Sequence, residues 1–112
     1  MVYLEDNQYC EYYYHKQLIG WCDILKPTNE INSVDYMIWN VYITGENNRN
    51  RGHGTRMIRQ AIKKCGRKKV YGLYVRKDNL AAIKVYTNNK FSIVREALIS
   101  NEAVYFMKRG NK

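Results

Sequence analysis

The residues best suited to chemistry lie in a polar, glycine-bearing segment at 45–54, which follows an apolar run. Gly52 and Gly54 have no Cβ, so the backbone there can approach a ligand closely. An amphipathic segment follows, and the first N–H groups of such a helix have no partner within it. With the helix dipole behind them, these groups favour an anion such as a pyrophosphate. Arg49 and Arg51 add positive charge nearby, so the sequence predicts an anion site at this junction.

Two well-known phosphate-binding motifs do not fit this loop. The sequence has no G-x-x-x-x-G-K-[ST] loop. It also lacks the third glycine of the dinucleotide fingerprint and the acid expected roughly 20 residues later. Taken alone, the loop is also compatible with a tight strand-to-helix turn that needs glycine for packing only. Binding and packing therefore remain two alternatives at this point.

The charges of the chain are unevenly distributed. The 112 residues include nineteen Lys and Arg and ten Asp and Glu, which gives a formal net charge of +9. Between residues 49 and 90 the one acid is Asp78, whereas the first 48 residues are acidic on balance. A basic surplus attracts nucleic acid, an acidic membrane or a multiply phosphorylated cofactor. We therefore expect any anion site in the second half of the chain.

Hydrophobic patterns predict the elements that must position this loop. Strands are expected at 9–15 and 18–25 as a hairpin, and at 34–44, where both faces are apolar as in a central strand. After the loop, apolar residues with helical spacing predict an amphipathic helix that ends at Gly66. They are Met57, Ile58, Ala61, Ile62 and Cys65.

The rest of the chain completes an α/β (α+β) domain. A strand is expected at 70–75, a helix at 80–88 capped by Asp78 or Asn79, and a hairpin at 91–96 and 103–108. The order is β-β-β-α-β-α-β-β over a single domain, residues 1–112. Such an order predicts a mixed central sheet of about six strands flanked by helices.

Two segments resemble the GNAT superfamily of N-acetyltransferases. Arg49-Asn50-Arg51-Gly52-His53-Gly54 is similar to its Q/R-x-x-G-x-G/A loop, and Thr55 follows as in its helix start. The stretch 73–91, with Asn79 and Tyr86, resembles its L-x-V…N-x-x-A…Y-x-x-x-G-F segment. The resemblance covers residues 12–108 and implies an acyl-CoA N-acyltransferase-like fold, here in a compact form with a shortened N-terminal region.

The resemblance implies acetyl transfer from acetyl-CoA to a primary amine by direct attack in a ternary complex. It implies that the amides of residues 51–55 hold the pyrophosphate and that the backbone of Tyr42 and Ile43 holds the pantetheine arm and thioester. Asn79 matches an asparagine that contacts the arm, and Tyr86 matches a tyrosine that protonates the leaving thiolate. The implied cofactor-binding set is Tyr42, Ile43, Arg49, Asn50, Arg51, Gly52, His53, Gly54, Thr55 and Asn79.

The residue types suit this chemistry. Attack on a thioester builds negative charge on the carbonyl oxygen, which N–H donors stabilise, and a phenol can give a proton to the leaving sulfur. The general base is less evident, and Asp35, at the start of the strand predicted at 34–44, is the candidate. Each assignment has a structural alternative: Asp35 as a solvated acid, Tyr86 as core, Asn79 as a helix cap and His53 as an exposed loop residue.

The remaining sequence features restrict the setting. Cys10, Cys22 and Cys65 are odd in number and widely spaced, which favours reduced thiols in a cytoplasmic protein without a metal site. No apolar run reaches the ~18 residues of a membrane span, and the N-terminus does not read as a signal peptide. The acceptor, a small molecule or a protein, stays open, as does a homodimer. The alternatives are an inactive CoA-binding regulatory module and, less favoured, a basic nucleic-acid-binding domain.

Overall fold

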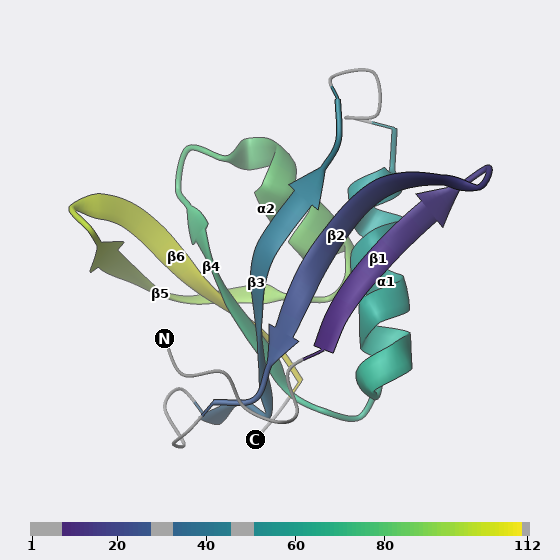
Figure 1. The fold of residues 1–112 in the computed structure, drawn as a ribbon. Helices are drawn as coiled ribbons and strands as arrows, with labels where there is room; N and C mark the ends of the chain where they lie inside the picture. The colour runs from purple at the N-terminus through teal and green to yellow at the C-terminus, as the bar shows by residue number, and fades with distance from the viewer. Residues whose placement is uncertain (1–7, 28–32, 46–50, 111–112) are drawn as a thin grey trace.

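A mixed sheet with two helices against it forms the framework of the molecule (Figure 1). The computed structural model describes residues 8–27, 33–45 and 51–110, and within them it contains six strands and two helices. Their order confirms the β-β-β-α-β-α-β-β prediction. The elements are β1 (Gln8–Tyr14), β2 (Gln17–Leu25), β3 (Tyr36–Ile43), α1 (His53–Cys65), β4 (Tyr71–Arg76), α2 (Leu80–Asn88), β5 (Ser92–Ile99) and β6 (Glu102–Arg109).

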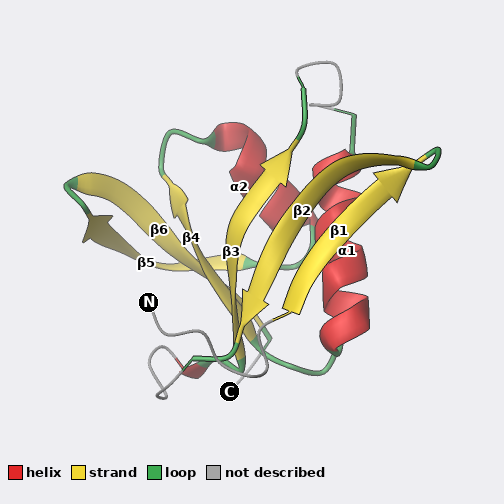
Figure 2. Ribbon diagram, in the orientation of Figure 1, coloured by secondary structure: helices red, strands yellow, loops and turns green. Residues whose placement is uncertain are grey.

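The strands lie side by side in the order β1-β2-β3-β4-β6-β5. The pairs β1–β2, β2–β3, β4–β6 and β5–β6 are antiparallel, whereas β3 and β4 are parallel. A parallel pair needs a crossover connection, which α1 provides. The end of β3, which precedes the predicted anion loop in the sequence, therefore lies at the centre of the sheet (Figure 2).

β3 and β4 separate soon after they begin. Their ladder joins Tyr36 to Tyr71 and Met37 to Gly72 and goes no further, and the two strands then diverge (Figure 1). β3 also carries a bulge, because two of its residues, Asn40 and Val41, lie opposite the single residue Cys22 of β2. Asn40 lies in this bulge with φ 53°, a left-handed conformation that Asn tolerates better than most residues. The sheet is thus open between the second halves of β3 and β4.

The main core lies between the sheet and the helices. α1 buries Met57, Ile58, Ala61 and Ile62, as its apolar spacing predicted. It ends at Cys65, and Gly66, with φ 126°, donates its N–H to the carbonyl of Ile62 at 2.8 Å, which confirms the predicted stop. Tyr86 of α2 is buried in the same core. Neither helix of the described residues is long and apolar enough to cross a bilayer.

Several predicted boundaries differ from the structure, and β3 begins at Tyr36, two residues after its predicted start. The first hairpin turns at His15 and Lys16, with φ 51° and 65°, and not at Lys16 and Gln17. β5 extends to Ile99, three residues beyond its predicted end. It is an edge strand that is exposed along almost its whole length, so no alternation of apolar and polar residues marks where it stops.

Candidate functional site

A pocket of about 680 Å³ lies where β3 ends and α1 begins. Tyr42 and Ile43 line it from β3, and α2 contributes Tyr86. The remaining predicted residues that line it are Gly52, Gly54, Thr55 and Asn79. Residues far apart in the sequence are thus brought to one place. Arg49 and Asn50, which belong to the same predicted set, lie outside the described residues.

Glycine suits positions 52 and 54 of the loop for different physical reasons. Gly52 precedes α1 with φ 81°, a conformation that residues with a Cβ rarely adopt. Gly54 has no such φ, but a Cβ there would lie 3.1 Å from Cγ2 of Val85. Gly54 therefore allows α1 to pack closely on α2. This contact supports the packing alternative for Gly54, and both residues of the contact line the pocket.

The start of α2 is capped as predicted. The side-chain oxygen of Asn79 accepts a hydrogen bond from the N–H of Ala82 at 3.2 Å. The carbonyl of Asn79 accepts from the N–H of Ile83 at 3.1 Å. These bonds hold Asn79 at the wall of the pocket, so a cap and a ligand contact are compatible roles for this residue.

Asn89 is a buried polar residue that the sequence interpretation did not single out. Its side-chain amide donates to the carbonyls of Thr55 at 3.1 Å and Val85 at 3.0 Å. Arg109 in turn donates to the carbonyl of Asn89 at 3.0 Å. Asn89 therefore ties the end of α2 to the first turn of α1. Its position after the helix gave no sequence signal, because Asn at a helix end is common for local reasons.

Tyr86 is a buried residue that lines the pocket. The residue is 6% exposed, and its ring lies 5.9 Å from that of Phe91. Burial, with a smaller contribution from Cys22, raises the pKa of Tyr86 to about 12. The phenol is protonated at neutral pH, as any tyrosine is, and it is a weaker acid than an exposed tyrosine. A protonated phenol at this wall is a proton donor or a hydrogen-bond donor to a group in the pocket.

His53 is buried, which corrects the prediction of an exposed loop histidine. It is 4% exposed as the first residue of α1. Its Nδ1 lies 3.1 Å from the Tyr12 hydroxyl and 3.1 Å from Nη2 of Arg56. The guanidinium has only donors, so Nδ1 of His53 carries no proton here. Burial, and then the charge of Arg56, lowers the pKa of His53.

Arg56 joins this cluster to the predicted anion loop. Its Nε donates to the Tyr12 hydroxyl at 3.1 Å, and its Nη2 donates to the carbonyl of Arg51 at 3.2 Å. β1 thereby fixes both the end of the loop and the first turn of α1. Tyr12 and Arg56 are 44 positions apart, so no spacing rule could have found their contact.

Asp35 does not reach the pocket. It precedes the eight residues of β3, and the pocket lies at the other end of that strand, roughly 25 Å away at about 3.3 Å per residue. Its carboxylate accepts a hydrogen bond from the N–H of Val70 at 2.7 Å. Asp35 thus holds the start of β3 to the segment before β4. This placement gives the prediction of Asp35 as general base no support.

A different carboxylate lies beside the bulge of β3. The side chain of Asn40 donates to Oδ2 of Asp23 at 2.7 Å. Cys22 and Ile24 of β2 are buried in the helix-side core. Because side chains alternate along a strand, Trp21 and Asp23 face the side of the sheet without helices. Among the described residues, no group of three or more His, Cys, Asp or Glu could hold a metal ion.

Aromatic side chains surround Asp23 on this helix-free face. The rings of Trp21 and Tyr42 are 4.9 Å apart, and those of Trp39 and Tyr74 are 6.2 Å apart. The second pair spans the opening between β3 and β4. This face therefore combines flat apolar surfaces with one carboxylate, next to the backbone that forms the pocket wall.

The family of the chain follows from a sequence comparison. The family model for the acetyltransferase (GNAT) family matches residues 2–91. The chain therefore belongs to the GNAT family of acetyltransferases. Comparison with curated proteins gives no match.

Solved structures share the fold. The chain is similar to aminoglycoside acetyltransferase AAC(6')-Ib in complex with coenzyme A, with a TM-score of 0.80 and 14% identity over 96% of this chain and 68% of that one. It is also similar to PaiA N-acetyltransferase from Thermoplasma acidophilum with coenzyme A (TM-score 0.71, 17% identity, 95% and 62% covered). A third is NAA60 of Arabidopsis thaliana with a bisubstrate analogue (0.65, 21%, 83% and 64%). The chain spans about two thirds of the length of each.

Proposed function

We propose that this protein is an N-acetyltransferase that transfers an acetyl group from acetyl-CoA to a primary amine by direct attack in a ternary complex. The observation that carries the proposal is the single pocket that unites the end of β3, the start of α1 and the Tyr86 phenol. Its volume lies within the ~300–1,000 Å³ typical of ligand sites. Family membership and the coenzyme A complexes of the similar structures support the same reading.

The pocket walls suit the parts of acetyl-CoA in turn. The first-turn amides of α1, near Gly54 and Thr55, lack helical partners and favour the pyrophosphate. Arg51 adds charge at the end of the loop, and we assign Arg49, Asn50 and the His53 backbone to the same task. β3 leaves β4 after Met37, so the strand end at 42–43 can offer backbone groups to the pantetheine arm.

Acetyl-CoA supplies an activated acyl group and a thiolate leaving group. Tyr86 is proposed to give its phenolic proton to that sulfur as the carbon–sulfur bond breaks. The phenol carries this proton at neutral pH. An N–H donor of the bulged strand end is proposed to stabilise the negative charge that develops on the carbonyl oxygen.

The amine is proposed to arrive from the helix-free face. Asp23 carries a carboxylate beside the bulge, where it can attract an ammonium group and take its proton directly or through water. Trp21 and Tyr42 add aromatic faces, which bind cations favourably. Asp23 thus replaces Asp35 as the proposed base.

The test is acetyl-CoA binding by titration calorimetry, followed by release of free coenzyme A with a panel of primary amines. We expect Tyr86→Phe to bind acetyl-CoA as the native protein does and to lose about 100-fold in turnover, at the lower end of general-acid effects. Tyr36→Phe is the matched control, because Tyr36 is a partly buried tyrosine of β3 that lies outside the pocket. Its turnover should stay native.

Three results would contradict parts of the proposal. Binding of acetyl-CoA no tighter than that of a generic polyanion would remove the function. Tight binding without turnover on any amine would favour the inactive CoA-binding module. Full turnover in Tyr86→Phe would remove Tyr86 from the reaction and leave the function intact.

A further inference from the structure

The three cysteines, far apart in the sequence, converge under α1. Cys10 of β1 and Cys22 of β2 are Cα partners in the antiparallel ladder, and both side chains are buried in the helix-side core. Cys65 is the last residue of α1. Both Cys22 and Cys65 lie close enough to Cys10 to perturb its pKa. Three thiols therefore form one cluster that the acetyl-transfer proposal does not use.

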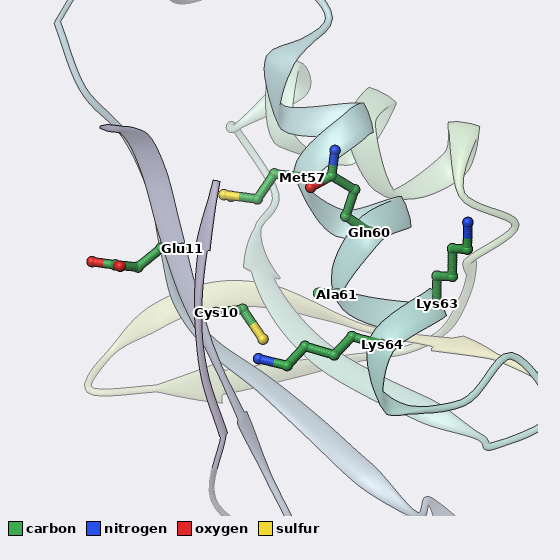
Figure 3. Close-up of a pocket in the computed structure, with 7 residues that line it drawn as sticks. All are labelled: Cys10, Glu11, Met57, Gln60, Ala61, Lys63 and Lys64. Atoms are coloured by element: carbon green, nitrogen blue, oxygen red, sulfur yellow. The ribbon is translucent and has the colours of Figure 1, made fainter. Parts of the chain in front are cut away.

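A cavity of about 460 Å³ between β1 and α1 leads to one of these thiols. Figure 3 shows the Cys10 side chain pointing from β1 toward α1, with the amino group of Lys64 beside its sulfur. The neighbouring Cys22 thiol, and then the charge of Lys64, lowers the pKa of Cys10 to about 7, whereas the pKa of Cys22 is raised. Cys10 lines the cavity, whereas Cys22 is fully buried and does not. Cys10 is thus the nucleophile of the pair, because the reactive form is an accessible thiolate.

We propose that Cys10 and Cys22 form an oxidative modification site that takes hydrogen peroxide through the cavity beside Lys64. The Cys10 thiolate attacks a peroxide oxygen; the O–O bond breaks, giving a sulfenic acid on Cys10 and hydroxide. The Cys22 sulfur then attacks the Cys10 sulfur, and the sulfenic oxygen leaves as water with the Cys22 proton. In sum, two thiols and one peroxide give one disulfide and two waters.

The geometry of the strands suits this bond. Directly opposed residues of antiparallel strands have Cα atoms about 4.5 or 5.5 Å apart, and disulfides form over about 4.4–6.8 Å. The bond would link two strands that are already paired, so the fold should persist. Cys10 is 6% exposed, which favours a small oxidant over a bulky disulfide.

The test treats the reduced full-length protein with hydrogen peroxide, alkylates the remaining thiols after unfolding, and maps the peptides. We expect a mass loss of two hydrogen atoms, a cross-linked Cys10–Cys22 peptide and an alkylated Cys65. In Cys22→Ser, the sulfenic acid on Cys10 should persist and be trapped by dimedone. Cys65→Ser should still form the disulfide.

Lys64 and its neighbour allow a matched comparison, since both line the cavity. Lys64→Met should slow the reaction with peroxide several-fold, whereas Lys63→Met should react at the native rate. Equal rates in the two variants would overturn the role of Lys64. A bond from Cys10 to Cys65, or thiols that react no faster than those of the urea-unfolded chain, would overturn the proposal.

Discussion

A methyl group at Gly20 should damage both the fold and the pocket. Gly20 of β2 pairs with Ile43 of β3, directly behind the pocket wall. A Cβ at Gly20 would lie 2.5 Å from the carbonyl oxygen of Tyr42 and 2.7 Å from Cδ1 of Ile43. The oxygen belongs to the backbone and cannot rotate away, so β3 itself must move. Overpacking of this kind costs about 1–3 kcal/mol of unfolding free energy.

The same displacement should weaken acetyl-CoA binding. Tyr42 and Ile43 line the pocket, and the proposed pantetheine contacts are backbone groups of these two residues. If the shift removes about one such hydrogen bond, worth about 1.4 kcal/mol, the dissociation constant rises about tenfold. We expect this change in Gly20→Ala by calorimetry on the folded protein.

Gly72→Ala is the control, because it crowds the other side of the sheet. A Cβ there would lie 2.9 Å from Cε1 of Phe106 and 3.0 Å from Cγ1 of Val34, in the second core cluster. Urea unfolding should show a similar loss of stability, with native acetyl-CoA affinity. The reasoning is refuted if Gly20→Ala is as stable as the native protein, or if both variants lose affinity equally.

Three further perturbations test single groups. Asn79→Ala should lower the free energy of unfolding in urea by about 1 kcal/mol, because the bond to Ala82 is lost. The folded state raises the pKa of Tyr86 from 10.0 to about 12. The stabilisation from this shift is therefore complete below pH 10 and is lost as the pH approaches 12. Urea titrations across this range should show a fall of about 2–3 kcal/mol in the free energy of unfolding, which Tyr86→Phe should lack. The folded state lowers the pKa of His53, so the unfolded chain binds a proton more readily than the folded one. The free energy of unfolding should therefore fall as the pH drops below 6.5. His53→Gln should reduce this pH dependence.

Most of the fold could be predicted from local patterns. The spacing of Met57, Ile58, Ala61 and Ile62 specified α1, and Gly66 marked its end. The prediction located the edge strand β5 but ended it three residues too early, because exposed positions such as Leu98 give no pattern of burial. Local patterns reveal an element when one of its faces is buried, and they fail where neither is.

The sequence predicted only those residues of the candidate site that belong to a recognised motif. Gly52, Asn79 and Tyr86 could be named because a loop and a helix present them in a fixed order. The contact of Tyr12 with Arg56 depends on how β1 packs against α1, and the bulge at Asn40 depends on pairing with β2. Both are tertiary features with no local signature, and so is the position of Asp35 at the end of β3 away from the pocket.

Close backbone approach explains why this pocket depends on more glycines than the motif names. Gly54 lets α1 contact Val85 of α2, and Gly20 lets β2 approach the carbonyl of Tyr42. The contact of Gly54 with Val85 is part of the pocket wall, whereas that of Gly20 lies behind it. Substitution of either residue should therefore alter ligand affinity through the position of a wall, even though Gly20 offers no group to a ligand. Gly54 and Gly20 thus act through the same steric effect. At Gly72, by contrast, an added Cβ would crowd Phe106 on the opposite face of the sheet.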